Sequence, residues 1–213
     1  MIPIYKTPQI LSLLAPNLTW KVKTDQKVIY LTFDDGPVPG LTDYVLDELK
    51  NHDALATFFC VGENIHKYPE TCQKIIDHGH LIGNHTYNHL KGWSTKNELY
   101  FTNIDKCQAE IERFQHSSGR AVFRPPHGQI TRKQVTYIRK KYQIVMWDIL
   151  TYDYQIKLAP PQRLDKIIKK TSPGTIIVFH DNFKGEKNLR YLLPRYLYHF
   201  KNIGFKFKKL DAH

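Results

Sequence analysis

The sequence predicts one α/β domain in which parallel strands and outer helices alternate and form an open sheet or a barrel. Two observations lead to this fold class. Strand-like and helix-like segments alternate along all 213 residues, with no internal repeat or low-complexity linker. The run Thr175-Ile176-Ile177-Val178-Phe179 is continuously apolar, as a parallel strand buried on both faces requires. We therefore take residues 1–213 as one domain, with its motif-bearing core at about residues 28–210.

The first expected elements follow from local chemistry. Strand-forming residues at positions 28–31 run towards two adjacent aspartates and a Gly-Pro breaker, so the strand ends there. Apolar side chains then repeat at helical spacing over residues 42–52, with Thr42 as the expected N-cap. Two phenylalanines mark a second strand at residues 55–61, which Gly62 closes.

The next expected elements are two helices separated by a short strand. The first of these helices opens at Pro69 and ends at His78-Gly79, and the strand follows at residues 81–83. The longest helical pattern of the chain then covers residues 96–117, and Gly119 ends it. Its expected inward stripe consists of Leu99, Ile104, Cys107, Ile111 and Phe114.

The second half of the chain continues the alternation. Trp147 and Asp148 lie within a strand-like segment, and Pro161 suits the first position of a helix. The expected elements, in order, are a strand at residues 121–123, a basic helix at 131–142, a strand at 143–149, a helix at 161–171, a strand at 175–179, a helix at 188–202 and an edge or closing strand at 205–210.

Composition limits the classes of function. The formal net charge is +11, which favours anionic partners, but the basic residues are scattered and form only doublets. No helix-turn-helix, zinc-finger or aromatic RNA-binding pattern is present, so we expect a solvated basic surface and no nucleic-acid partner. No apolar run is long enough to cross a bilayer, so no transmembrane segment is predicted. We expect a monomer.

Cysteines and the first residues bear on the compartment. The three cysteines (Cys60, Cys72 and Cys107) cannot all pair within one chain, and none forms a metal-type doublet. We expect buried thiols, which fit a reducing compartment. Residues 1–16 show no compact basic-then-apolar signal sequence, so the sequence leaves the compartment open.

Polar and reactive residues follow four of the expected strands. Asp34 and Asp35 follow the first strand, His85 and His89 the third, Arg124 the fourth, and His180 the strand at residues 175–179. Parallel strands bring all these ends to one rim, where such folds place their ligands. The alternative interpretation of Asp34 and Asp35 is a solvated turn. The remaining histidines are expected to be surface or structural residues: His52, His66, His78, His80, His116, His199 and His213.

A histidine pair and an aspartate suggest a metal site. One turn of helix would aim His85 and His89 in the same direction, and two imidazoles with one carboxylate make a three-ligand zinc site. The alternative is a pair of capping or solvated histidines. Zinc lowers the pKa of bound water to roughly 7, and a second carboxylate and a separate imidazole offer a general base and a general acid. With no Gly-x-Ser-x-Gly elbow present, these residues favour metal-assisted hydrolysis.

Four motifs, in this order, resemble those of the polysaccharide deacetylase family (the NodB-homology domain, carbohydrate esterase family four). They are Thr32-Phe33-Asp34-Asp35-Gly36-Pro37, His85-Thr86-Tyr87-Asn88-His89, Arg124-Pro125-Pro126-His127-Gly128 and Ile177-Val178-Phe179-His180. The resemblance implies a deformed (β/α) barrel of parallel strands with outer helices. It also implies a divalent metal, usually zinc with Co²⁺ or Mn²⁺ as alternatives, and the removal of acetyl groups from sugars.

The same resemblance assigns roles to residues. It implies that Asp35, His85 and His89 bind the metal. It implies that Asp34 is the general base, with Arg124 as its salt-bridge partner, and that His180 is the general acid. The metal and the backbone N–H just after Pro126 would stabilise the oxyanion. Four residues are expected to face the substrate: Pro126, His127, Tyr154 and Val178.

Two positions depart from the family pattern. His127 stands where the third motif usually has tyrosine, which alters the wall that faces the sugar. Leu150 occupies the place that we assign to the carboxylate that orients the acid histidine. Asp148, Asp153 and Asp181 are the candidates to replace it.

The resulting hypothesis is a metal-dependent hydrolase that removes N-acetyl groups from amino sugars in a glycan, such as a polysaccharide, peptidoglycan or a chitin oligomer. One rival is an esterase that removes O-acetyl groups from acetylated xylan with the same residues. Another rival, suggested by Leu150 and His127, is a catalytically weak glycan-binding protein on the same scaffold. Nucleic-acid binding driven by the net charge ranks last.

Overall fold

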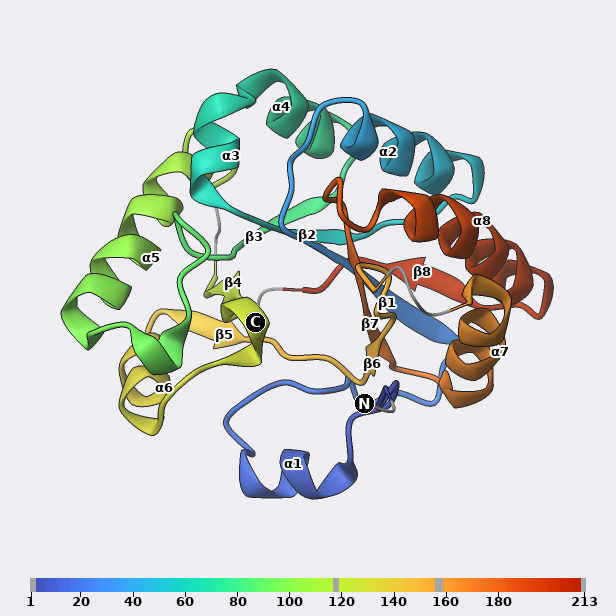
Figure 1. Ribbon diagram of the computed structural model, residues 1–213, viewed down its shortest axis with the longest axis horizontal. Coiled ribbons are helices and arrows are strands. Elements are labelled where there is room, and N and C mark those ends of the chain that lie inside the picture. Colours follow the sequence, from blue (N-terminus) through green and yellow to red (C-terminus); the bar gives the residue numbers. More distant parts are fainter. Residues whose placement is uncertain (1–2, 117–118, 156–158, 212–213) are drawn as a thin grey trace.

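A curved sheet of parallel strands lies at the centre of the structure, a computed structural model that describes residues 3–116, 119–155 and 159–211. Seven strands follow one another in the spatial order β5-β4-β3-β2-β1-β7-β6, and β8 lies beside β1. The sheet curls into a half-barrel (Figure 1). The strands are β1 (Val28–Asp34), β2 (Thr57–Cys60), β3 (Leu81–Asn84), β4 (Ala121–Phe123), β5 (Tyr142–Ile144), β6 (Ile149–Leu150), β7 (Ile176–His180) and β8 (Lys206–Lys208).

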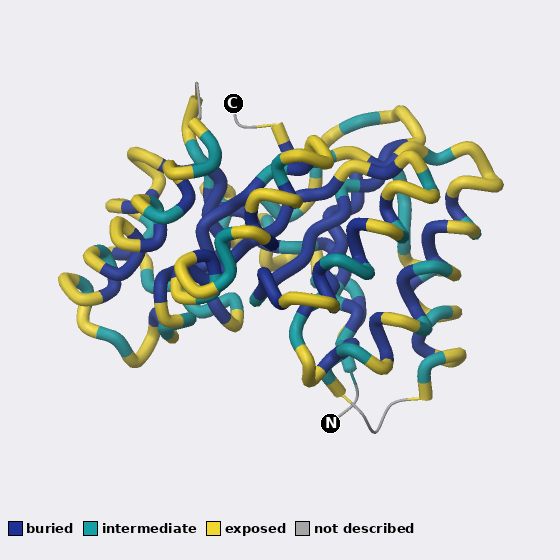
Figure 2. Tube along the Cα trace, turned by 90° about the horizontal axis from the view of Figure 1, so that it is seen from above, coloured by how far each residue is buried: buried dark blue, intermediate teal, exposed yellow. Residues whose placement is uncertain are grey.

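Helices surround this sheet on the outside (Figure 1). Their outward faces are exposed, whereas the strands and the helix faces that pack on them are buried (Figure 2). This arrangement confirms the α/β class with parallel strands and outer helices. The helices are α1 (Gln9–Leu14), α2 (Leu41–Asn51), α3 (Gly62–Lys67), α4 (Pro69–Asp77), α5 (Asn97–Ile111), α6 (Arg132–Ile138), α7 (Pro160–Lys170) and α8 (Glu186–Asn202).

Strand β1 lies in the interior of the sheet and is buried on both faces. It pairs with β2 on one side and with β7 on the other, and β8 pairs with its first residues on the β2 side. The ring of Phe33 stacks between those of Phe58 and Phe179, with centroids 4.9 and 5.8 Å away. Asp34 is in register with His180 at the carboxyl ends of β1 and β7. The sheet therefore brings these two polar residues side by side.

The segment before β1 lies between the two ends of the curved sheet. Lys6 forms an antiparallel bridge with Ile149 in β6, and Thr19 forms a parallel bridge with Val145 just after β5. Helix α1 lies between these two bridges in the sequence (Figure 1). The sequence assigned no element here, because prolines at positions 3, 8 and 16 break the apolar pattern.

The expected strand at residues 143–149 is wrong as a single element. The structure has two strands, β5 and β6, and the chain between them leaves the sheet. In this interval the carbonyl oxygens of Val145 and Met146 accept hydrogen bonds from Arg124 at 3.3 and 2.7 Å. A buried guanidinium must satisfy its donors, and here it uses backbone groups that an unbroken strand would pair within the sheet.

Two expectations about helices are also wrong. Thr42 is not an N-cap: α2 begins at Leu41, and the Asp43 carboxylate accepts from the Gly40 N–H at 2.7 Å. Leu99 does not face inward, because its side chain is 58% exposed. The pattern also missed α3, and α5 ends at Ile111.

Several simpler expectations are confirmed. The three cysteines are free and buried, and no helix among the described residues is long and apolar enough to span a membrane. His80 is structural, because it is buried and its Nδ1 accepts from the Ala56 N–H at 3.2 Å. The expectations for Ser117, as the end of a helix, and for His213 lie outside the described residues.

Candidate active site

Asp34 and Asp35 follow one another at the end of β1 but face different partners. Asp34 is the last residue of the strand and is 4% exposed. Asp35 leaves the strand with φ 82°, a left-handed conformation that aspartate tolerates better than most residues. One carboxylate therefore points to the buried Arg124 and the other to a pair of histidines.

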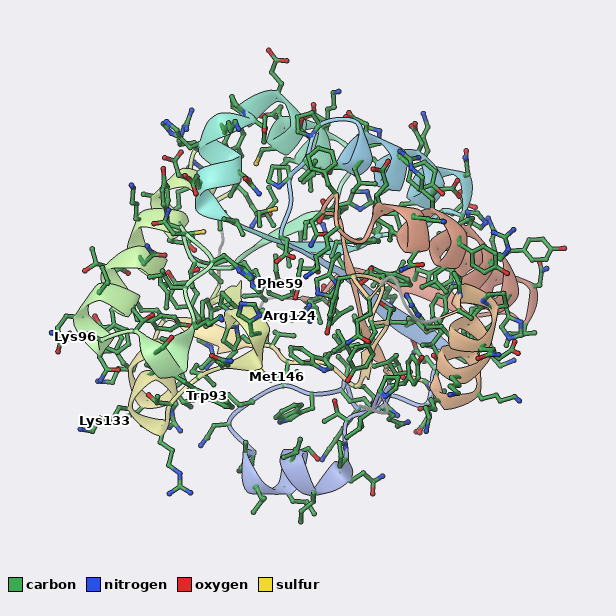
Figure 3. All side chains as sticks on the ribbon, viewed as in Figure 1. Phe59, Trp93, Lys96, Arg124, Lys133 and Met146 are labelled. Atoms are coloured by element: carbon green, nitrogen blue, oxygen red, sulfur yellow. The ribbon has the colours of Figure 1, made fainter. Side chains whose placement is uncertain are left out.

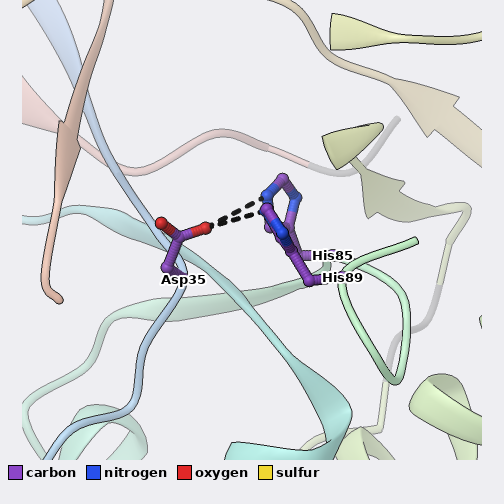
Figure 4. A group of neighbouring side chains, drawn as sticks. All are labelled: Asp35, His85 and His89. Carbon is purple, nitrogen blue, oxygen red and sulfur yellow. Dashed lines mark ion pairs between the residues drawn. The ribbon is translucent and has the colours of Figure 1, made fainter. Parts of the chain in front are cut away.

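Asp35, His85 and His89 form a cluster of three ligand atoms. The Oδ1 atom of Asp35 lies 3.1 Å from Nε2 of His89 and 3.6 Å from Nε2 of His85 (Figure 4). One ligand atom from each of the three residues lies within 4.8 Å of the other two. Two imidazole nitrogens and one carboxylate oxygen that converge in this way fit a divalent cation.

The tautomer of His85 also fits a metal ligand. The ring is 2% exposed, and its Nδ1 lies 2.8 Å from the carbonyl oxygen of Arg124. A carbonyl oxygen can only accept, so Nδ1 carries the hydrogen. Nε2, which faces Asp35, is then the nitrogen available to a cation, as in metal-binding histidines whose other nitrogen is held by a backbone carbonyl.

The two histidines do not lie on a turn of helix, so that expectation is wrong. β3 ends at Asn84, and the loop that follows has left-handed residues at Thr86 (φ 63°) and His89 (φ 54°). The Oδ1 atom of Asn103 in α5 accepts hydrogen bonds from two backbone N–H groups of the loop, at 2.7 and 3.0 Å. A loop fastened to a neighbouring helix, and not helical spacing, aims both imidazoles at Asp35.

Asn182 holds the other oxygen of Asp35. Its Nδ2 donates to Oδ2 of Asp35 at 2.6 Å, which leaves Oδ1 directed at the histidines. Burial alone would raise the pKa of Asp35, but the hydrogen-bonding contacts of His85 and His89 outweigh it and hold that pKa well below its usual range. Asp35 is therefore ionised, as a metal ligand must be. The sequence analysis did not identify Asn182 as a site residue. The only feature of the sequence that points to it is its position two residues after His180.

Replacing Asn182 with alanine is expected to weaken binding of a divalent cation by about 10- to 100-fold, the usual cost of losing a partner that orients a ligand. Isothermal titration calorimetry of the metal-depleted protein with Zn²⁺ measures this change in affinity. The control is Phe183→Ala at the adjacent residue, whose side chain is 70% exposed. Equal metal affinity of Asn182→Ala and the wild type would contradict the role of Asn182.

Asp34 and Arg124 form a buried ion pair. Arg124 is fully buried, and its Nη1 donates at 2.7 Å both to Oδ1 of Asp34 and to Oγ1 of Thr32. Its guanidinium carbon lies 4.1 Å from the centroid of the Phe59 ring, at the centre of the molecule (Figure 3). Burial lowers the pKa of Arg124 and the Asp34 carboxylate opposes that shift. These contacts fix the direction of one Asp34 oxygen.

Asp153 orients His180. Its Oδ1 lies 2.7 Å from Nδ1 of His180, and its Oδ2 accepts from the His180 backbone N–H at 2.7 Å. Of the other two candidates, Asp148 accepts from Thr175, and Asp181 accepts from Gly36 and Thr42. Burial alone would lower the pKa of His180, but Asp153, followed by Asp35 and Asp34, raises it to about 9.

These side chains open into one cavity of about 370 Å³. Arg124 lies behind Asp34, and Pro126 is buried and does not line the cavity, unlike the other residues expected to face the substrate. A hollow of about 420 Å³ beside α5 contains none of these side chains. The cavity residues are Asp34, Asp35, His85, His89, His127, Trp147, Leu150, Tyr154, Val178, His180, Asn182 and Lys184.

The chain is similar in sequence to known proteins. The model of the polysaccharide deacetylase family matches residues 21–147. A peptidoglycan-N-acetylglucosamine deacetylase of Bacillus cereus is 33% identical over 153 residues, which are 71% of this chain and 55% of that protein. A second Bacillus cereus protein of the same name is 30% identical over 194 residues, which cover 89% of each chain.

Solved structures with the same fold include a deacetylase and a mutant of a pseudoenzyme. A peptidoglycan N-acetylglucosamine deacetylase in complex with a naphthyl N-hydroxybenzamide superposes with a TM-score of 0.87 at 28% identity, covering 96% of this chain and 95% of that one. A mutant of a carbohydrate esterase family four pseudoenzyme, with restored enzymatic activity, superposes with a TM-score of 0.77 at 25% identity. The match covers 90% of this chain and 68% of that one.

Proposed function

Because the chain belongs to the polysaccharide deacetylase family, we propose that it removes N-acetyl groups from amino sugars in a glycan by metal-dependent hydrolysis. The observation that carries this proposal is the convergence of three groups on one cavity. These groups are the Asp35-His85-His89 cluster, Asp34 with Arg124 behind it, and His180 with Asp153 behind it. Each group has the chemistry that one part of an amide hydrolysis needs.

Asp35, His85 and His89 would hold the divalent cation. The donor set suits Zn²⁺, our preferred assignment, with Co²⁺ and Mn²⁺ as alternatives. When bound in such a site, the cation acts as a Lewis acid and lowers the pKa of water. The protein orients two of these ligands itself. The backbone carbonyl of Arg124 accepts from Nδ1 of His85, and Asn182 holds the Asp35 carboxylate.

Asp34 is the proposed general base. Arg124 occupies its Oδ1, and the described residues offer its Oδ2 no hydrogen-bond partner. This second oxygen is therefore available to accept the proton of the attacking water. The buried guanidinium, fastened to two backbone carbonyls, keeps the carboxylate from turning away.

His180 is the proposed general acid. Asp153 occupies its Nδ1, so the proton that reaches the departing nitrogen comes from Nε2. A pKa raised to about 9 keeps the ring protonated near neutral pH, as a group that donates its proton must be. The ring of Tyr154 lies edge-on against the ring of His180, with the two centroids 5.0 Å apart. Together with Leu150 and Val178, it gives this side of the cavity an apolar wall for an acetyl methyl group.

The backbone of His127 is the proposed oxyanion donor from the protein. The residue adopts φ 57° in the loop after β4, and its ring lies edge-on against His89 at 4.7 Å. The described residues offer its N–H no hydrogen-bond partner. Because the donor is a backbone group, histidine in place of tyrosine leaves this function intact.

Replacing Asp153 with asparagine is expected to move the alkaline limb of the rate–pH profile to lower pH. His180 must be protonated to act, so activity falls as pH rises through its pKa, which lies at about 9 in the wild type. Loss of the Asp153 charge lets burial dominate and lowers that pKa. The measurement is kcat against pH from 6 to 10 for both proteins.

Asp148→Asn is the matched control for this experiment. Asp148 is also a buried aspartate near β6, but it binds Thr175 and does not contact His180. The alkaline limb of the rate–pH profile of Asp148→Asn should coincide with that of the wild type. If Asp153→Asn also kept the wild-type limb, His180 would not be the acid.

The proposed function itself is tested by acetate release from a panel of acetylated glycans. Metal-depleted protein, reloaded with Zn²⁺, should release acetate from chitin oligomers or peptidoglycan, and chelation should abolish the release. Faster release from acetylated xylan would identify an O-acetyl esterase instead. Binding of glycan without any acetate release would identify a family pseudoenzyme and refute the proposal.

A further inference from the structure

We propose that Trp93 is a stacking platform for a sugar ring of the same glycan, at a distance from the residue whose acetyl group is removed. This inference rests on the proposed function. Trp93 is 68% exposed, although tryptophan is highly buried on average in folded proteins. Figure 3 shows it away from Arg124, on the side of the molecule where α5 and α6 lie.

The indole ring of Trp93 is held in a fixed orientation. Its Nε1 donates to the carbonyl oxygen of Ile130 at 3.2 Å, so the polar atom of the ring is already used. What remains for a ligand is the flat apolar surface of the indole. An aromatic face with its single donor satisfied suits the apolar face of a pyranose ring better than it suits a polar or charged group.

The loop that carries Trp93 is packed tightly against the loop after β4. The Gly92 carbonyl accepts from Nε2 of Gln134 at 2.8 Å, and a Cβ at Gly92 would collide with the Gln129 carbonyl oxygen. Only glycine permits this close approach of the two backbones. The platform therefore stands on two loops that support each other.

These same two loops lead into the catalytic cavity. Closer to the metal ligands they meet through the rings of His89 and His127, whose centroids are 4.7 Å apart. Farther along they meet through Trp93 and Ile130. Trp93 lies four positions after His89 in the sequence, so their Cα atoms are at most about 14 Å apart. An oligosaccharide bound with one sugar in the cavity can reach Trp93, whereas a single sugar in the cavity does not contact it, because Trp93 does not line the cavity.

The test compares long and short substrates. Trp93→Ala is expected to lower kcat/KM for the hexamer of N-acetylglucosamine by about 5- to 10-fold, the fold-change that corresponds to one aromatic contact. Its kcat/KM for the monosaccharide N-acetylglucosamine should equal that of the wild type. Trp93→Phe, which retains an aromatic face, should recover part of the loss on the hexamer.

Tyr198→Ala is the matched control, because Tyr198 is 66% exposed but lies on α8, away from these loops. It should leave both substrates unaffected. The platform would be overturned if Trp93→Ala kept the wild-type rate on the hexamer, or if it lost equally on the hexamer and the monosaccharide. If the wild type released no acetate from either substrate, the proposed function would fail on its own. Calorimetry with the hexamer would then decide: weaker binding by Trp93→Ala supports the platform, and unchanged binding refutes it.

Discussion

Replacing Asp35 with alanine is expected to remove the bound metal and to lower the deacetylase activity by at least about 10³-fold. The Lewis-acid contribution of a metal amounts to several kcal/mol, and each 1.36 kcal/mol corresponds to a factor of ten in rate. Asp35 is the only carboxylate in the cluster formed with His85 and His89, so the variant loses the negative charge that offsets the cation. Metal content by mass spectrometry and acetate release are measured on the same samples.

Backbone strain and loss of charge must be separated in this experiment. Asp35 has φ 82°, a left-handed conformation that costs alanine more free energy than it costs aspartate or asparagine. Asp35→Asn keeps the shape and the left-handed tolerance but removes the charge, and it should also lose most of the metal. Asp105→Ala, at a half-exposed aspartate of α5, is the control. A metal-loaded, active Asp35→Ala protein would disprove the ligand assignment.

The second large effect is expected from replacing Asp34 with asparagine. This variant should retain the metal, because Asp34 is not in the ligand cluster, and lose about 10²- to 10⁴-fold in kcat, the contribution of a general base. Asparagine keeps an oxygen for the Arg124 hydrogen bond but cannot take up a proton. Full activity of Asp34→Asn would refute the assignment of Asp34 as the base.

The buried position of Arg124 complicates this variant. Removing one charge of a buried pair costs about 3–5 kcal/mol of stability, so thermal unfolding must be recorded beside the kinetics. Thr32→Val is the matched control, because Thr32 accepts from the same Nη1 atom of Arg124 but has no place in the proposed chemistry. If Thr32→Val lost as much activity as Asp34→Asn, the loss would reflect the position of Arg124 and not a missing base.

The motifs allowed most of the candidate site to be predicted. Asp34, Asp35, His85, His89 and His180 all line the same cavity. The reason is geometric: the residues that follow parallel strands meet at one edge of the sheet, so polar residues just after apolar runs converge. Alternation of strand-like and helix-like segments was sufficient for the fold class for the same reason, since it leaves a parallel sheet as the simplest arrangement.

Residues that orient the proposed ligands and the proposed acid could not be assigned in this way. Three aspartates were equal candidates for the partner of His180, and only the path of the chain after β6 shows that Asp153 reaches Nδ1. Asn182 has no motif of its own, and its contact with Asp35 depends on how the segment after β7 returns over the end of β1. The break between β5 and β6 likewise depends on a guanidinium that belongs to β4's loop.

The sequence by itself determined the parallel α/β fold and that Asp34, Asp35, His85 and His89 follow strand ends, because periodicity and residue type at strand ends are local properties of the chain; the candidate metal ligands among them followed from the family motifs. Only the tertiary structure decided which aspartate orients His180, which side chain holds the second oxygen of Asp35, how a loop aims the two histidines, and that Trp93 on the same loop is exposed. Those features are contacts between segments far apart in the sequence, and a hydrogen bond depends on distance and direction in space, which no local pattern contains.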